Sequence, residues 1–228
     1  MLKNCCKYEV ILADTKESKN IHYKLRYQIY CLEKKFLNVE NPKEEIEKDF
    51  YDEKSIHFLV KNGHRWIGTF RLVIDHLEEL PFYKASIPDL PQFTQNKLIA
   101  AEFSRLGILR PFQKLNNGQS PHESSNQESE IMLQLLNAAR DYCRVNSIDH
   151  IIFLCRRSIT RVLKQLELQA QQIGPAIFHY GPRVPFAINL TDNLDGFNSL
   201  VNQYLSTDKS YSLYSERYSN EVPQILAA

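Results

Sequence analysis

The sequence lacks several features that would identify common classes of protein. Its 28 lysine and arginine residues almost balance 27 aspartate and glutamate residues, so no global field favours binding to nucleic acid or to an acidic membrane. Its five cysteines include no C-x-x-C pair, and its seven histidines show no spacing typical of metal ligands. We therefore expect free thiols in a reducing compartment, no bound metal and no nucleic-acid partner.

Long apolar runs are also missing. The N-terminal segment MLKNCCKYEVILADTK has no apolar core of the signal-peptide kind, and no later stretch is long enough to span a bilayer. We therefore expect a cytoplasmic protein. The chain also has no internal repeat and no linker that would divide domains. Its 228 residues predict one domain over 1–228, with a core at about 8–190 and a partly helical C-terminal extension at 191–228.

Hydrophobic periodicity predicts strands alternating with helices. The clearest local signal is Asn62-Gly63 between two β-rich runs, which predicts a hairpin with a type I′ turn. The other expected elements are a strand at 8–13, a helix at about 19–35, a strand around AAEFSRLGIL, a helix at about 129–145, a strand in DHIIFLC, a helix in SITRVLKQLELQAQQ and strands in AIFHYGPRVPFAINL. We expect 81–95 to be irregular and 114–129 to be a mobile loop. This order predicts one mixed α/β sheet with helices on its faces.

Charged residues stand at unusual places in this pattern. The segment EKDFYD carries Glu47, Asp49 and Asp52; such a cluster is typical of a solvated loop, but its like charges raise one another's pKa unless cations compensate. Glu102 and Arg105 are three apart in a predicted strand, hence on opposite faces unless a bulge intervenes. Because charges inside strands are costly to bury without partners, the pattern indicates an ion-pair network or a ligand site.

Together with nearby aromatic residues, these charged residues form a pattern that resembles the motif of the acyl-homoserine lactone synthase and N-acyl amino acid synthase group of acyltransferases. The motif runs Arg-x-x-x-aromatic, aromatic, Glu-x-Asp-x-x-Asp, Gly-x-x-Arg-Leu and Glu-x-Ser-Arg. The matching positions are Arg26, Tyr30, Phe36, Glu47, Asp49, Asp52, Arg71, Glu102 and Arg105. The resemblance implies an α/β (α+β) GCN5-related N-acetyltransferase-like (GNAT) fold, with a mixed, central twisted sheet flanked by helices.

Several other segments resemble a narrower group of acyltransferases. RYQIYCLEKKFL, SIHFLV, GTFRLV, EFSRLGI and IGPAIFHYGPRVPF look like the PEP-CTERM/exosortase system-associated acyltransferases over roughly 8–190. This resemblance implies transfer of a long-chain acyl group from an acyl-carrier-protein thioester to the amine of an amino acid or similar small molecule, with a lipid product that brings the protein close to membranes. Two alternatives stay open. One is an acyl-homoserine lactone synthase that uses S-adenosylmethionine, and the other is a non-catalytic acyl-binding module.

The segment after AAEFSRLGIL bears on the acyl donor. Acetyl-CoA-dependent enzymes of the resembled fold carry an [Arg/Gln]-x-x-Gly-x-[Gly/Ala] loop there, whose N–H groups hold the pyrophosphate. QKLNNGQSPHESSNQESE has a single glycine. We therefore expect acyl-acyl carrier protein, with acyl-CoA as the other choice, as donor substrate and no tightly bound cofactor. Candidates for docking an acidic carrier protein are Arg156, Arg157, Arg161 and Lys164, which share the region after DHIIFLC.

Direct acyl transfer from a thioester to an amine defines the roles that we assign. Glu47 or Glu102 is the candidate base, with Glu102 expected to be held by an arginine, and Arg105 is counted with them as a catalytic residue. Backbone N–H groups near Leu106 and Gly107 would bind the oxyanion. Asp49 and Asp52 would hold the acceptor's ammonium group, Arg26, Arg71 or Arg105 would bind its carboxylate, and Tyr30 and Phe36 complete the substrate site. Cys31 and Cys155 lack a suggestively placed histidine, so we expect no covalent intermediate.

Overall fold

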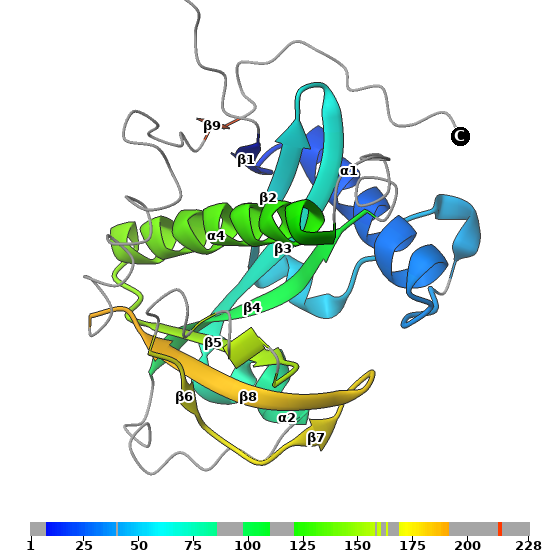
Figure 1. Cartoon of the computed structure of the whole chain (residues 1–228). Helices are drawn as coiled ribbons and strands as arrows, with labels where there is room; N and C mark the ends of the chain where they lie inside the picture. The colour runs from blue at the N-terminus through cyan, green and yellow to red at the C-terminus, as the bar shows by residue number, and fades with distance from the viewer. Residues whose placement is uncertain are drawn as a thin grey trace, which may run out of the picture.

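One large sheet organises the fold (Figure 1). The computed structural model describes residues 8–39, 41–85, 98–109, 121–157, 159–160, 163, 169–191 and 214–215. The strands lie in the order β6-β8-β5-β4-β3-β2-β1-β9, and β7 pairs with β8. The β4–β5 and β1–β9 pairs are parallel and the others are antiparallel. The predicted mixed α/β sheet flanked by helices is therefore confirmed.

The elements follow the predicted order with a few changes in extent. The strands are β1 (Glu9–Leu12), β2 (Ser55–Asn62), β3 (Arg65–His76), β4 (Ile99–Ile108), β5 (His150–Cys155), β6 (Gln171–Gln172), β7 (Ile177–Phe178), β8 (Pro182–Asn189) and β9 (Tyr214–Ser215). The helices include α1 (Lys16–Arg26), which continues as a π-helix (Tyr27–Glu33), α2 (Pro81–Ala85) and α4 (Pro121–Val145). Short 3-10 helices span Pro42–Glu44, Phe50–Lys54 and Leu77–Glu79. None of the helices in the described ranges is long and apolar enough to cross a membrane.

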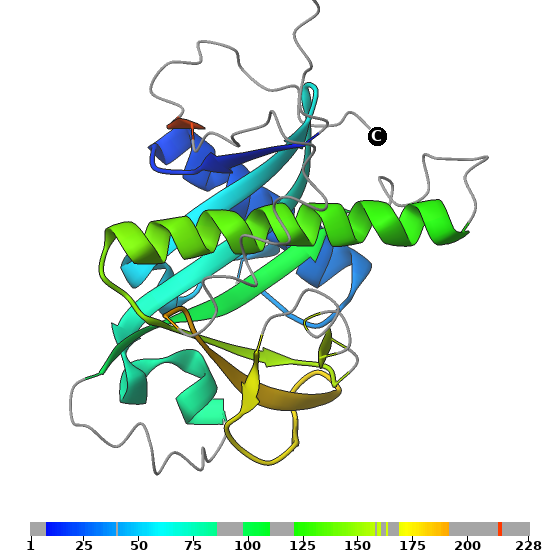
Figure 2. The same ribbon diagram turned by 60° about the vertical axis from the view of Figure 1, so that its left-hand side comes forward.

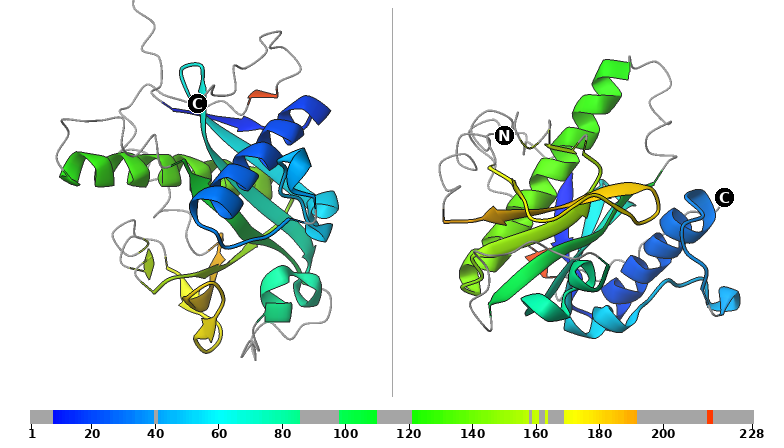
Figure 3. Two further views of the ribbon diagram at one scale, coloured as in Figure 1. Left: turned by 90° about the vertical axis from the view of Figure 1, so that its right-hand side faces the viewer. Right: turned by 90° about the horizontal axis from the view of Figure 1, so that it is seen from below.

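Helices cover both faces of the sheet. The long helix α4 crosses one face, and α1 and α2 lie against the other (Figures 2 and 3). Successive strand side chains point to opposite faces. Val10, Phe58, Ala101, Ile151 and Phe186 therefore join the core under α4, whereas Ile11, Leu59, Ala100, Ile152 and Ala187 join the cores under α1 and α2. This double burial explains why the strands are apolar runs rather than alternating ones.

Helix α1 is fixed closely to the centre of the sheet. Thr15 caps its N-terminus through a capping box with Ser18. At its other end, the fully buried Ile29 packs where β4 carries Gly107. A Cβ atom at position 107 would lie 2.8 Å from Ile29 Cγ2, so glycine permits this close approach. The approach places the next residue, Tyr30, beside β4.

The hairpin between β2 and β3 differs from its prediction by one residue. Asn62 is still in β2, where it pairs with Arg65, and Gly63 and His64 form the turn. Gly63 has a φ of +58°, and neither Asn62 nor His64 has a positive φ. A type I′ turn centred on Asn62 and Gly63 would need two positive values. The expected turn type is therefore wrong, although the hairpin itself is confirmed.

A β-bulge in β4 settles the orientation of Arg105. The register shifts between Thr69 and Arg71 of β3, so that Arg105 and Leu106 together lie opposite Phe70. Arg105 has a φ of +52°. In a regular strand Glu102 and Arg105 would point to opposite faces, but the bulge turns Arg105 to the face of Glu102, away from α4.

The parallel strands β4 and β5, at the centre of the sheet, separate toward one end. β4 and β5 pair only from Ala101–Phe103 to Ile151–Phe153. Beyond these residues β4 continues alongside β3, while Leu154 and Cys155 of β5 pair with β8. The ribbons of β4 and β5 diverge there in Figure 1. Among the residues that the structure describes, each strand therefore has an edge without a strand partner along this stretch.

Three expectations need correction. Residues 81–85 are helical rather than irregular, because Pro81 begins α2. Helix α4 begins at Pro121, so 121–129 is not a loop. The predicted helix after DHIIFLC does not continue to its end, since Gln171–Gln172 forms β6. The rest of the loop at 114–120 and most of the C-terminal extension lie outside the described residues.

Candidate active site

A cavity of about 450 Å³ lies where β4 and β5 separate. It has the size of a small-molecule site. On the α4 side its lining is apolar and includes Phe103, Met132, Leu136, Phe153, Ile159 and Leu163. Its polar lining includes Tyr30, Asp49, Arg71, Glu102, Ser104 and Arg105. The cavity therefore joins an apolar compartment to a polar one across the gap in the sheet.

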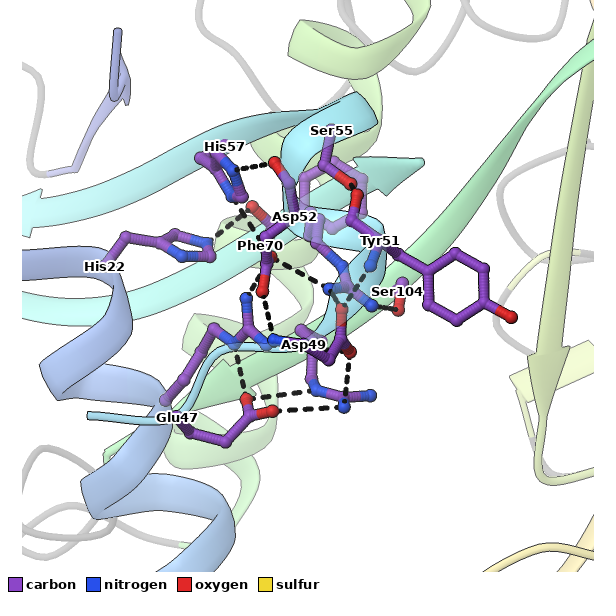
Figure 4. A network of polar contacts seen from close by, with 12 residues as sticks. His22, Glu47, Asp49, Tyr51, Asp52, Ser55, His57, Phe70 and Ser104 are labelled. Atoms are coloured by element: carbon purple, nitrogen blue, oxygen red, sulfur yellow. Dashed lines mark hydrogen bonds and ion pairs between the residues drawn. The ribbon is translucent and has the colours of Figure 1, made fainter. Parts of the chain in front are cut away.

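Three arginines and three carboxylates form a largely buried network of polar contacts (Figure 4). Its members Asp49, Arg71 and Arg105 line the cavity and form a wall of the polar compartment. Arg26, whose side chain is fully buried, contacts Glu47 (Nε–Oε2, 2.5 Å) and Asp52 (Nη1–Oδ1, 2.5 Å). Arg71 Nη1 lies 2.6 Å from Asp49 Oδ1 and 2.9 Å from Asp52 Oδ1. Arg105 contacts Glu47 at 3.1 Å and Asp49 at 2.9 Å. The three positive charges are thus matched by three negative charges.

The network favours the ionised forms of two of its carboxylates, Asp52 and Glu47. Burial alone would raise the pKa of Asp52, but Arg26 and Arg71 outweigh it and hold the pKa well below its ordinary value. Burial also opposes ionisation of Glu47, and Arg26 and Arg105 outweigh it and lower the pKa of that carboxyl group. Carboxylates stabilised in this way are weak bases.

Local sequence explains how the EKDFYD segment presents its carboxylates. Asp49 caps the 3-10 helix Phe50–Lys54, and its Oδ1 accepts the Tyr51 N–H at 3.0 Å. The Asp49 N–H in turn donates to Asp52 Oδ2 at 2.6 Å. This reciprocal capping box fixes both aspartates relative to each other. Arg71 binds the Asp52 oxygen that the capping box leaves, Oδ1, and shares Asp49 Oδ1 with the Tyr51 N–H. The other oxygen of Asp49, Oδ2, accepts from Arg105.

Glu102 stands apart from the network, although it lies on the same face of the sheet. Its Oε2 accepts the Phe82 N–H at 2.7 Å, and the residue is only 5% exposed. Burial raises the pKa of this carboxyl group to about 8, despite the Phe82 hydrogen bond and the charges of Arg71 and Arg105. In the described part of the chain, Glu102 forms no ion pair with an arginine. The expectation that an arginine holds it is therefore corrected, because α2 supplies the partner instead.

Tyr30 positions the bulged segment of β4. Its hydroxyl donates to the Leu106 carbonyl at 2.7 Å, and burial raises its pKa to about 12, so the phenol stays protonated. Leu106 lines the cavity and is 38% exposed. Gly107 does not line the cavity and pairs with Thr69. The Leu109 N–H bonds to the Ile67 carbonyl at 2.9 Å. By antiparallel alternation this makes Gly107–Thr69 a hydrogen-bonded pair, so Leu106 is the better candidate for an oxyanion donor.

The cavity does not include every predicted site residue. Tyr30, Phe36, Asp49, Arg71, Glu102, Arg105 and Leu106 line it. Arg26, Glu47 and Asp52 lie behind this wall, engaged with one another. This geometry disfavours the expectations that Glu47 is a base, that Asp52 holds an ammonium group and that Arg26 binds a carboxylate, and these three roles stay predictions. Arg71 and Arg105 border the cavity, but Asp49, Asp52 and Glu47 already bind their guanidinium groups.

Sequence reasoning missed the lining contributed by α2 and by the β7–β8 hairpin. Phe82, His179, Tyr180 and Arg183 all line the cavity. Tyr180 also stacks on Phe36, with ring centroids 5.5 Å apart. The hairpin residues lie in the segment IGPAIFHYGPRVPF, which carried a family resemblance but no chemical assignment. A capping-box pattern in Asp-x-x-Asp was a readable signal for the loop, whereas no local pattern marks the hairpin.

The remaining candidates lie in different positions. Cys155 lines the cavity, but burial raises the pKa of its thiol to about 12, which is unfavourable for a nucleophile. Arg156 and Arg157 are exposed just after β5. Arg161 and Lys164 lie outside the described residues, so the docking set stays a prediction. Within the described ranges, no three His, Cys, Asp or Glu side chains converge as metal ligands would.

The fold that carries this site is shared with solved structures of other proteins. Residues 25–118 match the family model for an acetyltransferase (GNAT) domain. No curated protein sequence matches the chain. The structure is similar to that of BjaI, a CoA-dependent acyl-homoserine lactone synthase with SAM and isopentyl-CoA. The TM-score is 0.62 at 17% identity, over 87% of this chain and 89% of BjaI.

Two further solved structures share the fold. The acyl-homoserine lactone synthase LasI has a TM-score of 0.57 at 20% identity, over 80% of this chain and 89% of that one. FeeM, an N-acyl amino acid synthase from uncultured soil microbes, has a TM-score of 0.55 at 16% identity, over 88% of this chain and all of FeeM. The predicted GNAT-like fold is thus confirmed, and with the family match it supports an acyltransferase. The resemblance to the exosortase-associated group stays a prediction.

Two buried histidines adjoin the ion network. The rings of His22 and His57 lie 4.6 Å apart, and both side chains are almost fully buried. His22 Nε2 lies 3.1 Å from the Phe70 carbonyl oxygen, and His57 Nε2 lies 3.3 Å from the Asp52 carbonyl oxygen. Burial lowers the pKa of His57 to about 4 and that of His22 well below its ordinary value. Both rings are therefore neutral in the folded protein at pH 7.

We predict that these histidines make the fold acid-labile. As pH falls below about 6.5, the unfolded chain binds protons that the folded chain does not, so stability decreases until pH reaches the folded pKa of His57, about 4. For His57 alone, the resulting decrease in the free energy of unfolding is on the order of 3 kcal/mol. Denaturant unfolding of His57→Gln should show a shallower decrease between pH 6.5 and 4.5, whereas the exposed His64→Gln control should follow the wild type. An unchanged slope in His57→Gln would contradict the prediction.

Proposed function

We propose that this chain is an N-acyltransferase that moves a long-chain acyl group from an acyl-carrier-protein thioester directly to the amine of an amino acid or similar small molecule. The main support is the single cavity that joins an apolar compartment to a polar one holding Glu102, a buried carboxyl group with a pKa of about 8. The GNAT domain match and the shared fold support acyl transfer in general.

The apolar compartment suits the acyl chain. Phe103 of β4, Phe153 of β5 and Leu136 of α4 line it. Each CH₂ group buried there would contribute about 0.8 kcal/mol, so a long chain would supply much of the affinity for the donor. The thioester would then lie in the gap between β4 and β5, because that gap connects the two compartments.

The polar compartment suits deprotonation of the acceptor amine. A base with a pKa near the working pH combines adequate ionisation with adequate proton affinity. Glu102 meets this condition, and its Phe82 hydrogen bond fixes one oxygen while the carboxyl group borders the cavity. Asp49, whose side chain is 26% exposed, would add a negative charge near the ammonium group.

The transfer step then needs only groups at the gap. The deprotonated amine attacks the thioester carbonyl carbon, the Leu106 N–H at the bulge would stabilise the oxyanion, and Tyr30 holds that segment through the Leu106 carbonyl. The C–N bond forms, the C–S bond breaks, and the proton first accepted by Glu102 passes to the leaving thiolate. Glu102 then accepts the second proton, which the attacking nitrogen loses as the amide forms, and releases it to solvent. No covalent enzyme intermediate is required.

The identity of the product tests this proposal. We expect incubation with long-chain acyl-carrier protein and an amino-acid panel to yield an N-acyl amino acid by mass spectrometry. Acyl-CoA belongs in the panel because BjaI, which shares the fold, is CoA-dependent. S-adenosylmethionine also belongs there. An acyl lactone would instead identify a homoserine lactone synthase, and fatty acid retained without turnover would identify a binding module.

A change at Glu102 should remove the base. We expect kcat/KM to rise with pH through about 8 as Glu102 loses its proton. Glu102→Gln should lower kcat by about 100-fold or more. The pH dependence of kcat/KM that remains in this variant should reflect only deprotonation of the acceptor's own ammonium group. Glu79→Gln, which changes an exposed carboxylate, is the control. Near wild-type turnover in Glu102→Gln would eliminate this residue as the base.

The basic residues after β5 should matter only for a carrier-protein donor. Arg157→Glu with Arg161→Glu should raise KM for acyl-carrier protein about tenfold or more, because the docking surface would repel an acidic partner. KM for acyl-CoA should not change. A matched pair, Arg65→Glu with Arg144→Glu, reverses two exposed charges elsewhere. Equal KM values for acyl-carrier protein in the two double variants would show that Arg157 and Arg161 do not dock the carrier protein.

A further inference from the structure

We propose that Arg183 binds the carboxylate of the acceptor, so that the preferred acceptor carries both an amine and a carboxylate. This inference deepens the proposed function and rests on it. It assigns a role to the β7–β8 hairpin, which the acyl-transfer mechanism above does not use.

The other arginines at the site are already neutralised. Arg26 lies behind the wall, with Glu47 and Asp52 on its guanidinium group. Arg71 is bound by Asp49 and Asp52, and its Nη2 donates to Ser104. Arg105 is bound by Glu47 and Asp49. A substrate carboxylate would have to displace a protein carboxylate from each of them.

Arg183 is different. It lines the cavity, and its hydrogen bonds go to two neutral acceptors, the carbonyl oxygens of Pro182 (3.1 Å) and Tyr180 (3.2 Å). Among the residues that the structure describes, no carboxylate lies within ion-pair distance of it. A guanidinium group has five N–H donors, so donors stay available for a carboxylate. Burial and the neighbouring Arg156 lower the pKa of Arg183, and a bound anion would relieve that repulsion.

The position of Arg183 in β8 favours the acceptor over the donor. Val184, Phe186 and Ile188 of β8 point into the core under α4, on the side of the acyl compartment. Strand alternation therefore directs Arg183 to the opposite face. Glu102 points to that face as well, since its neighbour Ala100 joins the core under α2. An acceptor with its amine at Glu102 could thus have its carboxylate at Arg183.

The hairpin that carries Arg183 is held in a defined shape. Tyr180 and Gly181 both have positive φ values, +50° and +105°. A Cβ atom on Gly181 would lie 3.4 Å from Arg183 Nη1, so the guanidinium group packs closely on the turn. Tyr180 is stacked on Phe36, which links the turn to the segment after α1. This support restricts the rotamers of Arg183 before substrate binds, which lowers the entropic cost of binding.

A comparison of amino acids with their amides tests the assignment. With the best acceptor from the product assay, we expect Arg183→Gln to raise KM for the amino acid by about 10- to 100-fold, because a charge-assisted hydrogen bond is lost. KM for the corresponding amide should already be high in the wild type and should not change in the variant. KM for the acyl donor should stay constant. Arg183→Lys should recover part of the effect, and Arg65→Gln, an exposed cation on the distant hairpin, is the control.

Direct binding separates this proposal from the proposed function. Calorimetric titration of the donor-free protein with the amino-acid panel and the amides needs no turnover. Binding that requires the carboxylate and Arg183 supports the assignment even if no N-acyl product forms. Equal affinity or equal KM in wild type and Arg183→Gln, with both proteins folded, would overturn it. A rise in KM for the acyl donor instead would also overturn it, because it would assign Arg183 to the donor's phosphate.

Discussion

The structure around the site depends on neutralising Arg26. Its side chain is fully buried at the end of α1, and an unpaired charge there would cost several kcal/mol. Glu47 and Asp52 supply the opposite charges, so the segment that carries them must pack against α1 and the sheet. The same carboxylates, with Asp49, then bind the other two arginines of the network. One buried cation thus fixes a loop, a helix and two strands relative to one another.

This closed network divides the polar residues into two groups. Residues within it have partners that hold their charge, as the lowered pKa of Asp52 illustrates. Glu102 and Arg183 border the same cavity without an ion-pair partner among the described residues. Burial raises the pKa of Glu102, so an arriving cation would favour its ionised form. Arg183 keeps its charge, and its burial near Arg156 favours the binding of an anion. Reactivity and recognition are therefore expected at the residues that the network leaves out.

Sequence reasoning predicted the sheet, its hairpin and the residues of the network, because apolar runs and motif spacing are local properties. It could not predict which charged side chains pair with one another and are therefore not available to a substrate. That outcome depends on the bulge in β4, which turns Arg105 toward Glu47, and a bulge follows from strand register rather than from composition. Glu102 was expected to have an arginine partner, but a backbone N–H from α2 reaches it instead. Arg183 stands in a segment that carried a family resemblance but no chemical assignment, and the fold brings it to the cavity.

The proposed mechanism depends on acyl transfer taking place in the gap between β4 and β5. A crystal structure with an unreactive long-chain acyl-pantetheine thioether, whose carbonyl group is retained, tests it most directly. We expect the carbonyl oxygen to lie within about 3.2 Å of the Leu106 amide nitrogen. We also expect the acyl chain to lie along Phe103, Leu136 and Phe153. A ligand bound outside this gap, or a chain directed toward Glu102, would contradict the account.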